Sequence, residues 1–363
     1  MANAERAWES VSGADRFPEF DRHEGVFRMS DPASGLLGFI AIHSTAAGPA
    51  VGGTRYWHYA SEEEAVRDVL RLSRAMSYKC ALAGVPYGGG KAVIMADSRQ
   101  PKSGAMLREY AERINALRGA FYTGEDVGID QADVTALAEH SSFIIGRETM
   151  AGDPGPWASL GVFHAMAAAI DEARPGRAWR DVSVAIQGLG KVGLGLARLV
   201  SGAGGRLIAA DINPAAVAAA VREFPGLRIV NAEDIHRQDA DVFSPNALGG
   251  VIAERMISEL RCYIVCGGAN NQLASDESAR LLYGRGILYI PDYVANAGGL
   301  IDVVDELSRD GYSRDRVLRR TAAIGGTVRR IVALSREQGK SPSEIADALG
   351  AKILEAAAAQ RLA

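Results

Sequence analysis

The segment Gln187-Gly188-Leu189-Gly190-Lys191-Val192-Gly193 decides the fold of the second half of the chain. It follows the apolar run Val182–Ile186, which is typical of a buried strand, and it precedes a stretch rich in Leu and Ala that favours a helix. The next apolar run, Arg206–Ala210, ends in Asp211. A G-x-G-x-x-G turn between a strand and a helix, with an acidic residue about 20 residues further on, indicates a dinucleotide-binding unit.

Four more apolar runs follow this unit, and helical stretches separate several of them. They are Leu227–Val230, Asp241–Ser244, Tyr263–Cys266 and Ile287–Ile290. Strands that alternate with helices predict a parallel, doubly wound sheet with right-handed crossovers. Polar, glycine-rich loops at 267–271 and 291–299 follow the last two strands. We expect these loops at the carboxyl ends of the strands, where such sheets bind ligands.

The first half of the chain predicts a separate α/β domain. Gly25–Met29 and Leu37–His43 read as paired strands on either side of a turn-rich connection. Ser61 and Glu64 have the spacing of a capping box, and the helix that they open is expected to end near Lys79. Further predicted elements are strands at 50–55 and 92–95, and a short aromatic strand within 121–128 that ends in Glu125 and Asp126. Helices are predicted at 105–117 and 159–173, and a terminal helix is opened by Ser341-Pro342-Ser343-Glu344.

Pro86-Tyr87-Gly88-Gly89-Gly90-Lys91 is the second informative segment. Three glycines allow a backbone to approach a ligand closely, and they bring Lys91 to the start of an apolar strand. A nucleotide-binding P-loop is excluded, because Val85 stands where its first glycine is needed and Ala92 where its hydroxyl is needed. Two interpretations stay open at this point, a ligand site and a tight strand entry beside a solvated lysine.

Composition narrows the class of protein. The 363 residues suit two domains, and a net charge of −4 with scattered Lys and Arg argues against nucleic acid as a partner. Three cysteines without a metal-ligand spacing indicate reduced thiols. The N-terminus does not resemble a signal peptide, and no apolar run reaches the roughly 18 residues of a membrane span. We therefore expect a soluble, cytoplasmic protein that has no membrane partner.

The histidines give no metal signature, because they lie far apart in the sequence without clustering. They are His23, His43, His58, His140, His164 and His236. Core or surface positions are the expected roles. We predict no metal site.

With these segments assembled, the chain resembles the glutamate/leucine/phenylalanine/valine dehydrogenase family, in the branch that acts on apolar amino acids. The resemblance covers nearly the whole chain, and its motifs occur in the family's order. They are Ala41-Ile42-His43, Gly52-Gly53-Thr54-Arg55, Met76-Ser77-Tyr78-Lys79, Gly88 to Lys91, Gly124 to Asp126, Gly188 to Gly193, Gly268 to Asn271 and Asn296-Ala297-Gly298-Gly299.

The resemblance implies two α/β domains with the active site in the cleft between them. Residues 1–148 would form the substrate-binding, catalytic and oligomerisation domain, completed by a C-terminal helix at 335–363. Residues 149–334 would form the doubly wound, Rossmann-type NAD-binding domain. A homo-oligomer assembled through the first domain is expected.

The implied reaction is the reversible oxidative deamination of an L-amino acid to its 2-oxo acid and ammonia, with hydride passing to NAD. By the resemblance, Lys91 would activate the attacking water and Asp126 would shuttle protons at the nitrogen. Lys79 and Asn270 would hold the substrate carboxylate, and the Gly53 backbone would contact the substrate. A lysine acts as a base near neutral pH only if burial or a neighbouring cation lowers its pKa, and two lysines lining one closed site would supply both.

The same resemblance implies an apolar substrate pocket. Its residues would be Val51, Gly124, Leu300 and Val303. The glutamate branch has a lysine where Val51 stands, so we expect glutamate to be rejected, because a buried carboxylate without a partner is costly. Leucine and aromatic amino acids such as phenylalanine and tryptophan are the expected substrates, with valine less favoured, and Gly124 is expected to leave room for a large side chain.

The implied NAD site comes from the turn after the first strand and from the loops after the other strands. Its residues would be Gly188, Leu189, Gly190, Lys191, Val192, Gly193, Asp211, Ile212, Ala247, Ala269, Asn271 and Asn296. The chain departs from the family at Asn246, where many relatives have cysteine, and at Asp153–Trp157.

Simpler interpretations accompany these roles. Asp126 could cap a helix, Asn270 could form a turn, and Asp211 could be a surface carboxylate. For the whole chain, the alternative is a dinucleotide-binding regulatory protein that has lost its chemistry. The presence of Lys79, Lys91 and Asp126 together argues against that alternative.

Overall fold

A computed structural model describes residues 9–95, 102–147 and 152–362, and the chain forms two compact units. Unit 1 comprises residues 1–152, 303–312 and 350–363, and unit 2 comprises residues 153–302 and 313–349. The chain therefore returns to unit 1 twice, within helix α10 (Gly298–Asp305) and within helix α12 (Pro342–Leu362). The predicted domain boundary at 148 lies outside the described residues.

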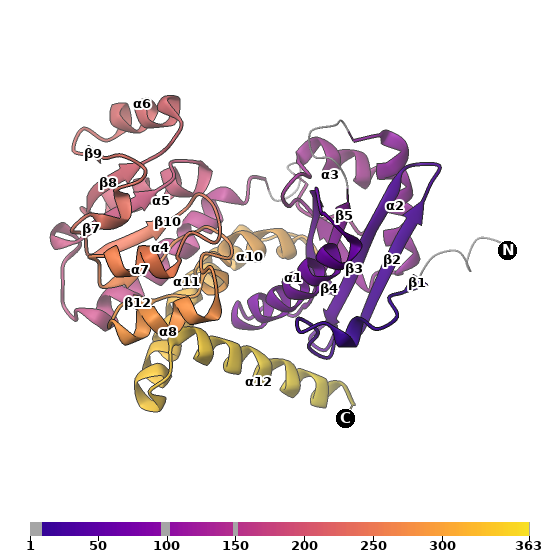
Figure 1. Ribbon diagram of the computed structural model, residues 1–363. Coiled ribbons are helices and arrows are strands. Elements are labelled where there is room, and N and C mark those ends of the chain that lie inside the picture. The colour runs from indigo at the N-terminus through magenta and orange to yellow at the C-terminus, as the bar shows by residue number, and fades with distance from the viewer. Residues whose placement is uncertain (1–8, 96–101, 148–151, 363) are drawn as a thin grey trace. The chain divides into compact units, whose positions relative to one another are not determined.

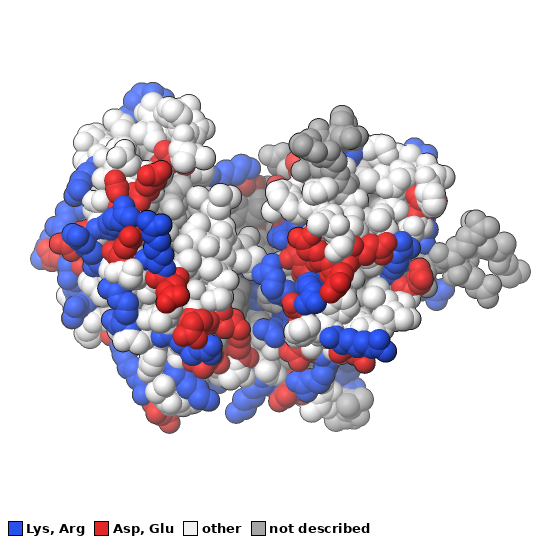
Figure 2. Space-filling view, in the orientation of Figure 1, with Lys and Arg blue, Asp and Glu red and all other residues white. Residues whose placement is uncertain are grey.

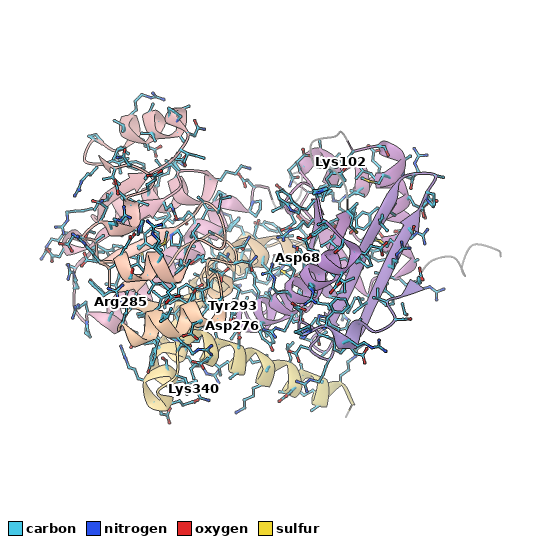
Figure 3. The ribbon with its side chains drawn as sticks, viewed as in Figure 1. Asp68, Lys102, Asp276, Arg285, Tyr293 and Lys340 are labelled. Atoms are coloured by element: carbon cyan, nitrogen blue, oxygen red, sulfur yellow. The ribbon has the colours of Figure 1, made fainter. Side chains whose placement is uncertain are left out.

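The last helix is divided between the units, whereas the sequence analysis assigned all of 335–363 to the first domain. Residues 335–349 pack in unit 2. One contact that holds them there joins helix α9 (Asp292–Ala295) to α12, because the Tyr293 hydroxyl donates a 2.5 Å hydrogen bond to Asp347 Oδ1. Tyr293 and the start of α12 can be followed in Figure 3.

Unit 1 is built on a mixed six-stranded sheet with the strand order β1-β2-β3-β5-β4-β6. The strands are β1 (Glu9–Ser10), β2 (Gly25–Asp31), β3 (Leu36–Ser44), β4 (Ala50–Trp57), β5 (Gly88–Met95) and β6 (Phe121–Gly124). The pairs β1–β2, β2–β3 and β3–β5 are antiparallel, and β4 runs parallel to both β5 and β6. The predicted pairing of β2 with β3 is confirmed.

Helices cover both faces of this sheet, as Figure 1 shows. Helix α1 (Glu62–Leu82) packs on one face, where Val69 and Leu70 meet Phe39 and Val93. Helices α2 (Gly104–Ala116) and α3 (Gln131–Ala138) cover the other face, which includes Ile40 and Ile94. Successive strand residues point to opposite faces. This explains why the central strands are apolar without interruption.

Unit 2 contains an all-parallel six-stranded sheet with the order β12-β11-β10-β7-β8-β9. The strands are β7 (Ser183–Gln187), β8 (Arg206–Ala210), β9 (Arg228–Ile229), β10 (Val242–Pro245), β11 (Ile264–Val265) and β12 (Leu288–Tyr289). Counted along the chain, this is the 3-2-1-4-5-6 order of dinucleotide-binding folds, which reverses direction between β7 and β10. The predicted fold class, two α/β domains of which one is doubly wound, is confirmed.

Along the chain, the helices of unit 2 come before, between and after these strands. They are α4 (Gly155–Ala173), α5 (Lys191–Gly202), α6 (Pro214–Glu223), α7 (Glu254–Glu259), α8 (Asp276–Gly284), α9 and α11 (Arg314–Gln338). Helix α11 is not among the elements predicted from the sequence. The predicted capping box at the start of α12 is present, because Ser341 Oγ accepts from the Glu344 N–H and Glu344 Oε2 accepts from the Ser341 N–H.

Charged side chains of both signs occur on the face of each unit that Figure 2 shows. None of the helices in the described ranges is both long enough and apolar enough to span a membrane.

Candidate active site

A carboxylate held between two cations forms the centre of the candidate site in unit 1. Lys91 is the fourth residue of β5, and its Nζ lies 3.1 Å from Asp126 Oδ1. The other oxygen of Asp126 accepts a 3.0 Å hydrogen bond from Arg55 Nε on β4. The exposed fractions of the three side chains are 6% for Lys91, 16% for Asp126 and 16% for Arg55. Asp126 therefore pairs with two cations and does not cap α3, whose N-cap is Asp130.

Burial and neighbouring charge set the proton affinities of this group. Burial lowers the pKa of Lys91, the carboxylate of Asp126 opposes that shift, and Arg55 adds to it. Burial alone would raise the pKa of Asp126, but the charges of Lys91 and Arg55 outweigh it and lower that pKa. The neighbouring cation of Lys91 that is expected from the sequence is a second lysine. In the structure the cation that lowers the Lys91 pKa is Arg55.

The triple glycine is part of strand β5 and is buried, whereas the sequence analysis expected it to lead into the strand and to approach a ligand. A Cβ on Gly88 would lie 1.8 Å from the Ser44 carbonyl oxygen. A Cβ on Gly89 would lie 2.0 Å from the Ser77 nitrogen of α1, and one on Gly90 would lie 2.8 Å from the Phe121 ring. Protein atoms therefore fill all three positions, and the glycines serve close packing of β5 against α1 and its neighbouring strands.

The same close packing positions Lys79. Ser61 caps the N-terminus of α1 by accepting a hydrogen bond from the Glu64 N–H, and the helix continues to Leu82 rather than ending near Lys79. Lys79 thus lies in the last turn, two residues after the contact between Ser77 and Gly89, and it is half-buried. Lys79 on α1 and Lys91 on β5 therefore lie on two elements that are in direct contact.

Gly53 allows the Asp126 loop to approach β4. A Cβ there would lie 2.4 Å from the Glu125 carbonyl oxygen and 2.9 Å from Asp126 Cβ. Gly53 and Arg55 are two residues apart in β4, so one strand both admits the loop and binds its carboxylate. Only glycine fits at position 53 with this loop geometry.

Gly124 differs from the expectation that it leaves space for a substrate side chain. A Cβ at Gly124 would lie 2.5 Å from the Ile145 carbonyl oxygen, so the missing methyl group faces the main chain. Of the other residues predicted for the substrate pocket, Val51 on β4 is fully buried, and Leu300 and Val303 on α10 are half-buried. Leu300 belongs to unit 2 and Val303 to unit 1.

Two histidines that are distant in the sequence meet in unit 1. The ring centroids of His23 and His43 lie 4.8 Å apart, and both side chains are buried. His43 Nδ1 lies 2.8 Å from Ser77 Oγ, and His23 Nε2 lies 3.0 Å from Ser73 Oγ. Burial lowers the pKa of His43 to about 4. Within the described ranges, no group of three or more His, Cys, Asp or Glu side chains is able to hold a metal.

The G-x-G-x-x-G turn of unit 2 uses each glycine differently. Gly188 has φ +92°, a left-handed conformation that makes the tight turn after β7. No atom lies within 4 Å of a Cβ added to Gly190, so the backbone is open at the N-terminus of α5. A Cβ on Gly193 would lie 1.9 Å from the Gly188 carbonyl oxygen, so helix and turn pack too closely for a side chain. These features fit the pyrophosphate of a dinucleotide at a helix N-terminus.

Asp211 follows β8 and is bound to the same turn. Its Oδ2 accepts a 2.6 Å hydrogen bond from the Leu189 N–H, and its Oδ1 accepts one of 2.7 Å from the Asn213 N–H. Ile212 beside it is 89% exposed. Lys191 and Val192 form the first turn of α5, and Lys191 is exposed with its Nζ 3.2 Å from Asp153 Oδ2.

Asn246 joins two loops at the carboxyl edge of the sheet. Its Nδ2 donates to the Ser244 carbonyl oxygen at 2.9 Å, and its Oδ1 accepts from the Gly268 N–H at 2.8 Å. Ala247 follows, exposed, and a Cβ on Gly188 would lie 3.0 Å from the Ala247 Cβ. The ends of β7 and β10 therefore meet at the point where the strand order reverses.

Asn270 is oriented by a partner from a different loop. Asn296, which is buried, donates from Nδ2 to Asn270 Oδ1 at 2.7 Å and to the Gly268 carbonyl oxygen at 3.3 Å. Asn271 has φ +52°, and its N–H donates to Asp292 Oδ2 at 2.5 Å. Ala269 is buried below the exposed Asn270. In this loop Asn271 adopts the left-handed conformation of the turn, and Asn270 is exposed with its side chain oriented by Asn296.

A groove in unit 2 lies at the amino ends of the strands and is not part of this site. Its lining includes Ser183, Arg206 and Arg228, which begin β7, β8 and β9. Parallel sheets bind ligands at the carboxyl ends of their strands, so this groove is at the wrong end.

Arg55, Asp68 and the contacts of Asn246 are not among the features predicted from the sequence. Asp68 lies on α1 (Figure 3), and its Oδ2 lies 2.9 Å from Arg55 Nη1. The available signal was the period of two along β4, which places Arg55 on the same side of the strand as Val51. A charged residue in line with a buried valine needs a partner.

Comparisons with known proteins support the resemblance found in the sequence. Residues 23–145 match the family described as Glu/Leu/Phe/Val dehydrogenase, dimerisation domain, and residues 214–361 match Glutamate/Leucine/Phenylalanine/Valine dehydrogenase. Leucine dehydrogenase of Geobacillus stearothermophilus is 39% identical, over 94% of this chain and 93% of that protein. Valine dehydrogenase of Streptomyces albus is 40% identical, over 93% of this chain and 94% of that protein.

A solved structure shares both the fold and the sequence pattern. L-tryptophan dehydrogenase from Nostoc punctiforme superposes with a TM-score of 0.82 at 37% sequence identity, covering 92% of this chain and 96% of that one. Identity at this level over both units, together with the Lys91–Asp126 pair and the G-x-G-x-x-G turn, assigns the family. The chain belongs to the glutamate/leucine/phenylalanine/valine dehydrogenase family, whose members are oxidoreductases acting on the CH–NH2 group of amino acids.

Proposed function

We propose that this enzyme catalyses the reversible, NAD-dependent oxidative deamination of an apolar L-amino acid. The amino acid, NAD and water give the 2-oxo acid, ammonium, the reduced cofactor and a proton. The observation that carries the proposal is the buried pair of Lys91 and Asp126, 3.1 Å apart. A base and a proton carrier in contact suit a reaction that moves protons at both a water and a nitrogen.

Lys91 is proposed as the general base that takes a proton from the water attacking the imine carbon. Its depressed pKa favours that role, because a lysine is a base only in its neutral form. Asp126 is proposed to give and take the proton at the substrate nitrogen. Lys79 and Asn270 would bind the substrate carboxylate, and the Gly53 backbone would position the substrate.

The residues of unit 2 fit a dinucleotide. Gly190 has no atom within 4 Å of its Cβ position, at the N-terminus of α5, so a pyrophosphate can approach the backbone. NAD, when bound, supplies the acceptor for the hydride. The cofactor-binding residues are proposed to be those of the 188–193 turn, Asp211 and Ile212, with Ala247, Ala269, Asn271 and Asn296 contributing from the other loops.

We infer that NAD is preferred over NADP. Asp211 keeps its carboxylate at the end of β8, where the ribose hydroxyls of a dinucleotide are bound in such folds. A carboxylate repels a 2′-phosphate, and Ile212 and Asn213 bring no cation to neutralise it.

The substrate side chain is proposed to be apolar, with leucine, phenylalanine, tryptophan and valine as the candidates, because the Ile145 carbonyl oxygen takes the space that was expected at Gly124. Val51 is fully buried and offers no charge to a substrate carboxylate. Leucine, valine and tryptophan enzymes are all similar to this chain at 37–40% identity, so sequence identity does not separate these substrates. One methylene in an apolar pocket changes discrimination by only about 1–3 kcal/mol, so several substrates should react.

The assembly and location follow the family. A homo-oligomer assembled through unit 1 is proposed, because that unit matches the family's dimerisation domain. The three cysteines are buried and unpaired, which suits the reducing cytoplasm.

The test is a substrate and cofactor panel with the wild-type enzyme. Formation of reduced cofactor is followed with leucine, valine, isoleucine, phenylalanine, tryptophan and glutamate, each with NAD and with NADP. We expect turnover with NAD and the apolar amino acids, and none of comparable efficiency with glutamate. NAD binding without turnover on any of the six amino acids would contradict the proposal.

A further inference from the structure

Arg55 bridges the candidate catalytic carboxylate and a second carboxylate on α1. Its Nε donates to Asp126 Oδ2 at 3.0 Å, and its Nη1 donates to Asp68 Oδ2 at 2.9 Å. The guanidinium is planar and rigid, so two contacts from different nitrogens fix its orientation. The side chain is 16% exposed, so these contacts are largely shielded from water.

Asp68 is itself held in place, so Arg55 has a fixed anchor. The Tyr59 hydroxyl donates to Asp68 Oδ2 at 2.8 Å, and Arg71 Nη2 lies 2.7 Å from Asp68 Oδ1. Asp68 is 15% exposed, whereas Arg71 is 49% exposed and faces solvent. Strand β4, the segment after it and helix α1 therefore all contribute to one ordered chain of charges that ends at Asp126.

The two oxygens of Asp126 have different partners, and only one of those partners changes its charge during the proposed reaction. Lys91 binds Oδ1 and must lose its proton to act as a base. Arg55 binds Oδ2 and keeps its charge at all relevant pH values. When Lys91 is neutral, Arg55 remains the one charged partner that Asp126 has among the contacts described above.

We propose that Arg55 is a positioning residue, which holds Asp126 beside Lys91 through the proton cycle and whose fixed charge favours the neutral form of that lysine. This inference rests on the proposed function. The groups that face the pair are Arg55, Asp68, Tyr59 and, through Asp68, Arg71.

The directions of the pKa shifts agree with this geometry. After burial and the opposing effect of Asp126, the charge of Arg55 is the next contribution to the pKa of Lys91, and it lowers that pKa. Arg55 also helps to lower the pKa of Asp126 against the effect of burial. Loss of the Arg55 charge would therefore raise both pKa values.

The test compares Arg55→Gln, which removes the charge, with Arg55→Lys, which keeps it but loses the rigid fork. We expect Arg55→Gln to lower kcat by about tenfold to a hundredfold, because small misplacements of catalytic groups carry costs of that size. The rising limb of kcat/KM against pH should move to higher pH in Arg55→Gln and should stay in place in Arg55→Lys. The KM for NAD should not change in either variant.

Arg28→Gln is the matched control. Arg28 also joins a strand to α1, through contacts of 2.8 Å and 2.9 Å to Glu62, but it has no contact with Asp126. Its loss should leave the pH profile unchanged. If Arg55→Gln shows the wild-type profile and no greater loss of kcat than Arg28→Gln, Arg55 is only a structural residue and the inference is wrong.

A second variant, Asp68→Asn, tests the same inference if Arg55→Gln does not fold. Asp68→Asn removes the anchor of Arg55 and leaves Arg55, Asp126 and Lys91 in the chain, so kcat should fall in the same direction by a smaller factor. A wild-type kcat in Asp68→Asn would contradict the positioning role even if Arg55→Gln does not fold. Failure of the proposed function itself is distinguishable, because the wild-type enzyme would then give no turnover at all.

Discussion

The side-chain oxygen of Asn246 accepts a 2.8 Å hydrogen bond from the Gly268 N–H, and this contact joins the loop after β10 to the loop after β11. The Gly268 carbonyl oxygen in turn accepts from Asn296, which also orients Asn270. Asn246 is thus connected to a residue proposed to bind substrate.

Asn246→Ala should loosen the Asn270 loop. We expect KM for the amino acid to rise severalfold and stability to fall by about 1 kcal/mol, the usual net value of one hydrogen bond. Asn246→Asp keeps the acceptor for Gly268 and should retain more of the substrate affinity than Asn246→Ala. Steady-state kinetics and urea unfolding of both variants check this, and equal KM values in Asn246→Ala and wild type would contradict it.

Lys91→Ala should remove turnover and leave NAD binding intact, because the lysine acts in the chemical step. A fall in kcat of about a hundredfold or more is expected for a general base, and Asp126→Asn should behave similarly. Lys102→Ala is the control, because Lys102, which is labelled in Figure 3, also pairs with a carboxylate in unit 1. Its Nζ lies 2.7 Å from Asp133 Oδ2. A Lys91→Ala enzyme as active as Lys102→Ala would show that Lys91 is not the base.

Alanine at position 190 and alanine at position 193 should have different effects on stability. In Gly190→Ala the methyl group meets no protein atom, so we expect a stability loss of about 1 kcal/mol or less and weaker NAD binding. In Gly193→Ala the methyl would lie 1.9 Å from a carbonyl oxygen, so both stability and NAD binding should be lost. Thermal unfolding and NAD titration measure this, with Gly202→Ala on α5 as the control that lowers neither stability nor NAD binding.

Asp211→Asn should narrow the preference for NAD over NADP. The amide keeps an acceptor for the Leu189 N–H and removes the charge that repels a 2′-phosphate. The variant therefore tests the effect of the charge while the structure of the turn is kept. The ratio of kcat/KM values for the two cofactors is the measurement. A wild-type enzyme that prefers NADP, or an unchanged ratio in the variant, would be inconsistent with the assigned role.

Unit 1 should lose stability as the pH falls from 6.5 to about 4, because His43 is buried and neutral. Its folded pKa of about 4 lies below the ordinary value of 6.5, so the unfolded chain takes up the proton first as the pH falls. The contribution is fully present above pH 6.5 and is lost by about pH 4, and it is on the order of 3 kcal/mol.

Urea unfolding at pH 7 and at pH 4.5 tests this contribution in the wild type and in His43→Gln. The variant has no titrating ring there, so its stability should depend less on pH over that range. His58→Gln changes an exposed histidine and should behave as the wild type does. Identical pH dependence in His43→Gln and wild type would refute the assignment.

Local sequence patterns were sufficient for much of the fold. The strand–turn–helix at 183–202, the acidic residue at the end of β8 and the capping box at Ser341 all depend on neighbours within about 20 residues, and each is present. Strand lengths near the edges of the sheet in unit 2 were overestimated, as with β11, which covers only Ile264–Val265. Hydrophobic runs indicate burial, and they do not specify how many residues pair.

Sequence by itself determined the family, the two α/β folds and the identity of the residues that carry the proposed chemistry. Tertiary structure decided their partners. Arg55 and Asp126 are 71 positions apart, and their contact exists because β4 lies beside β6 and because Gly53 lets the Asp126 loop approach. The role of the triple glycine in close packing is likewise visible only once α1 is seen to pack on β5. Backbone conformation is encoded locally, whereas the pairing of buried charges depends on register and packing between distant segments, which no local pattern contains.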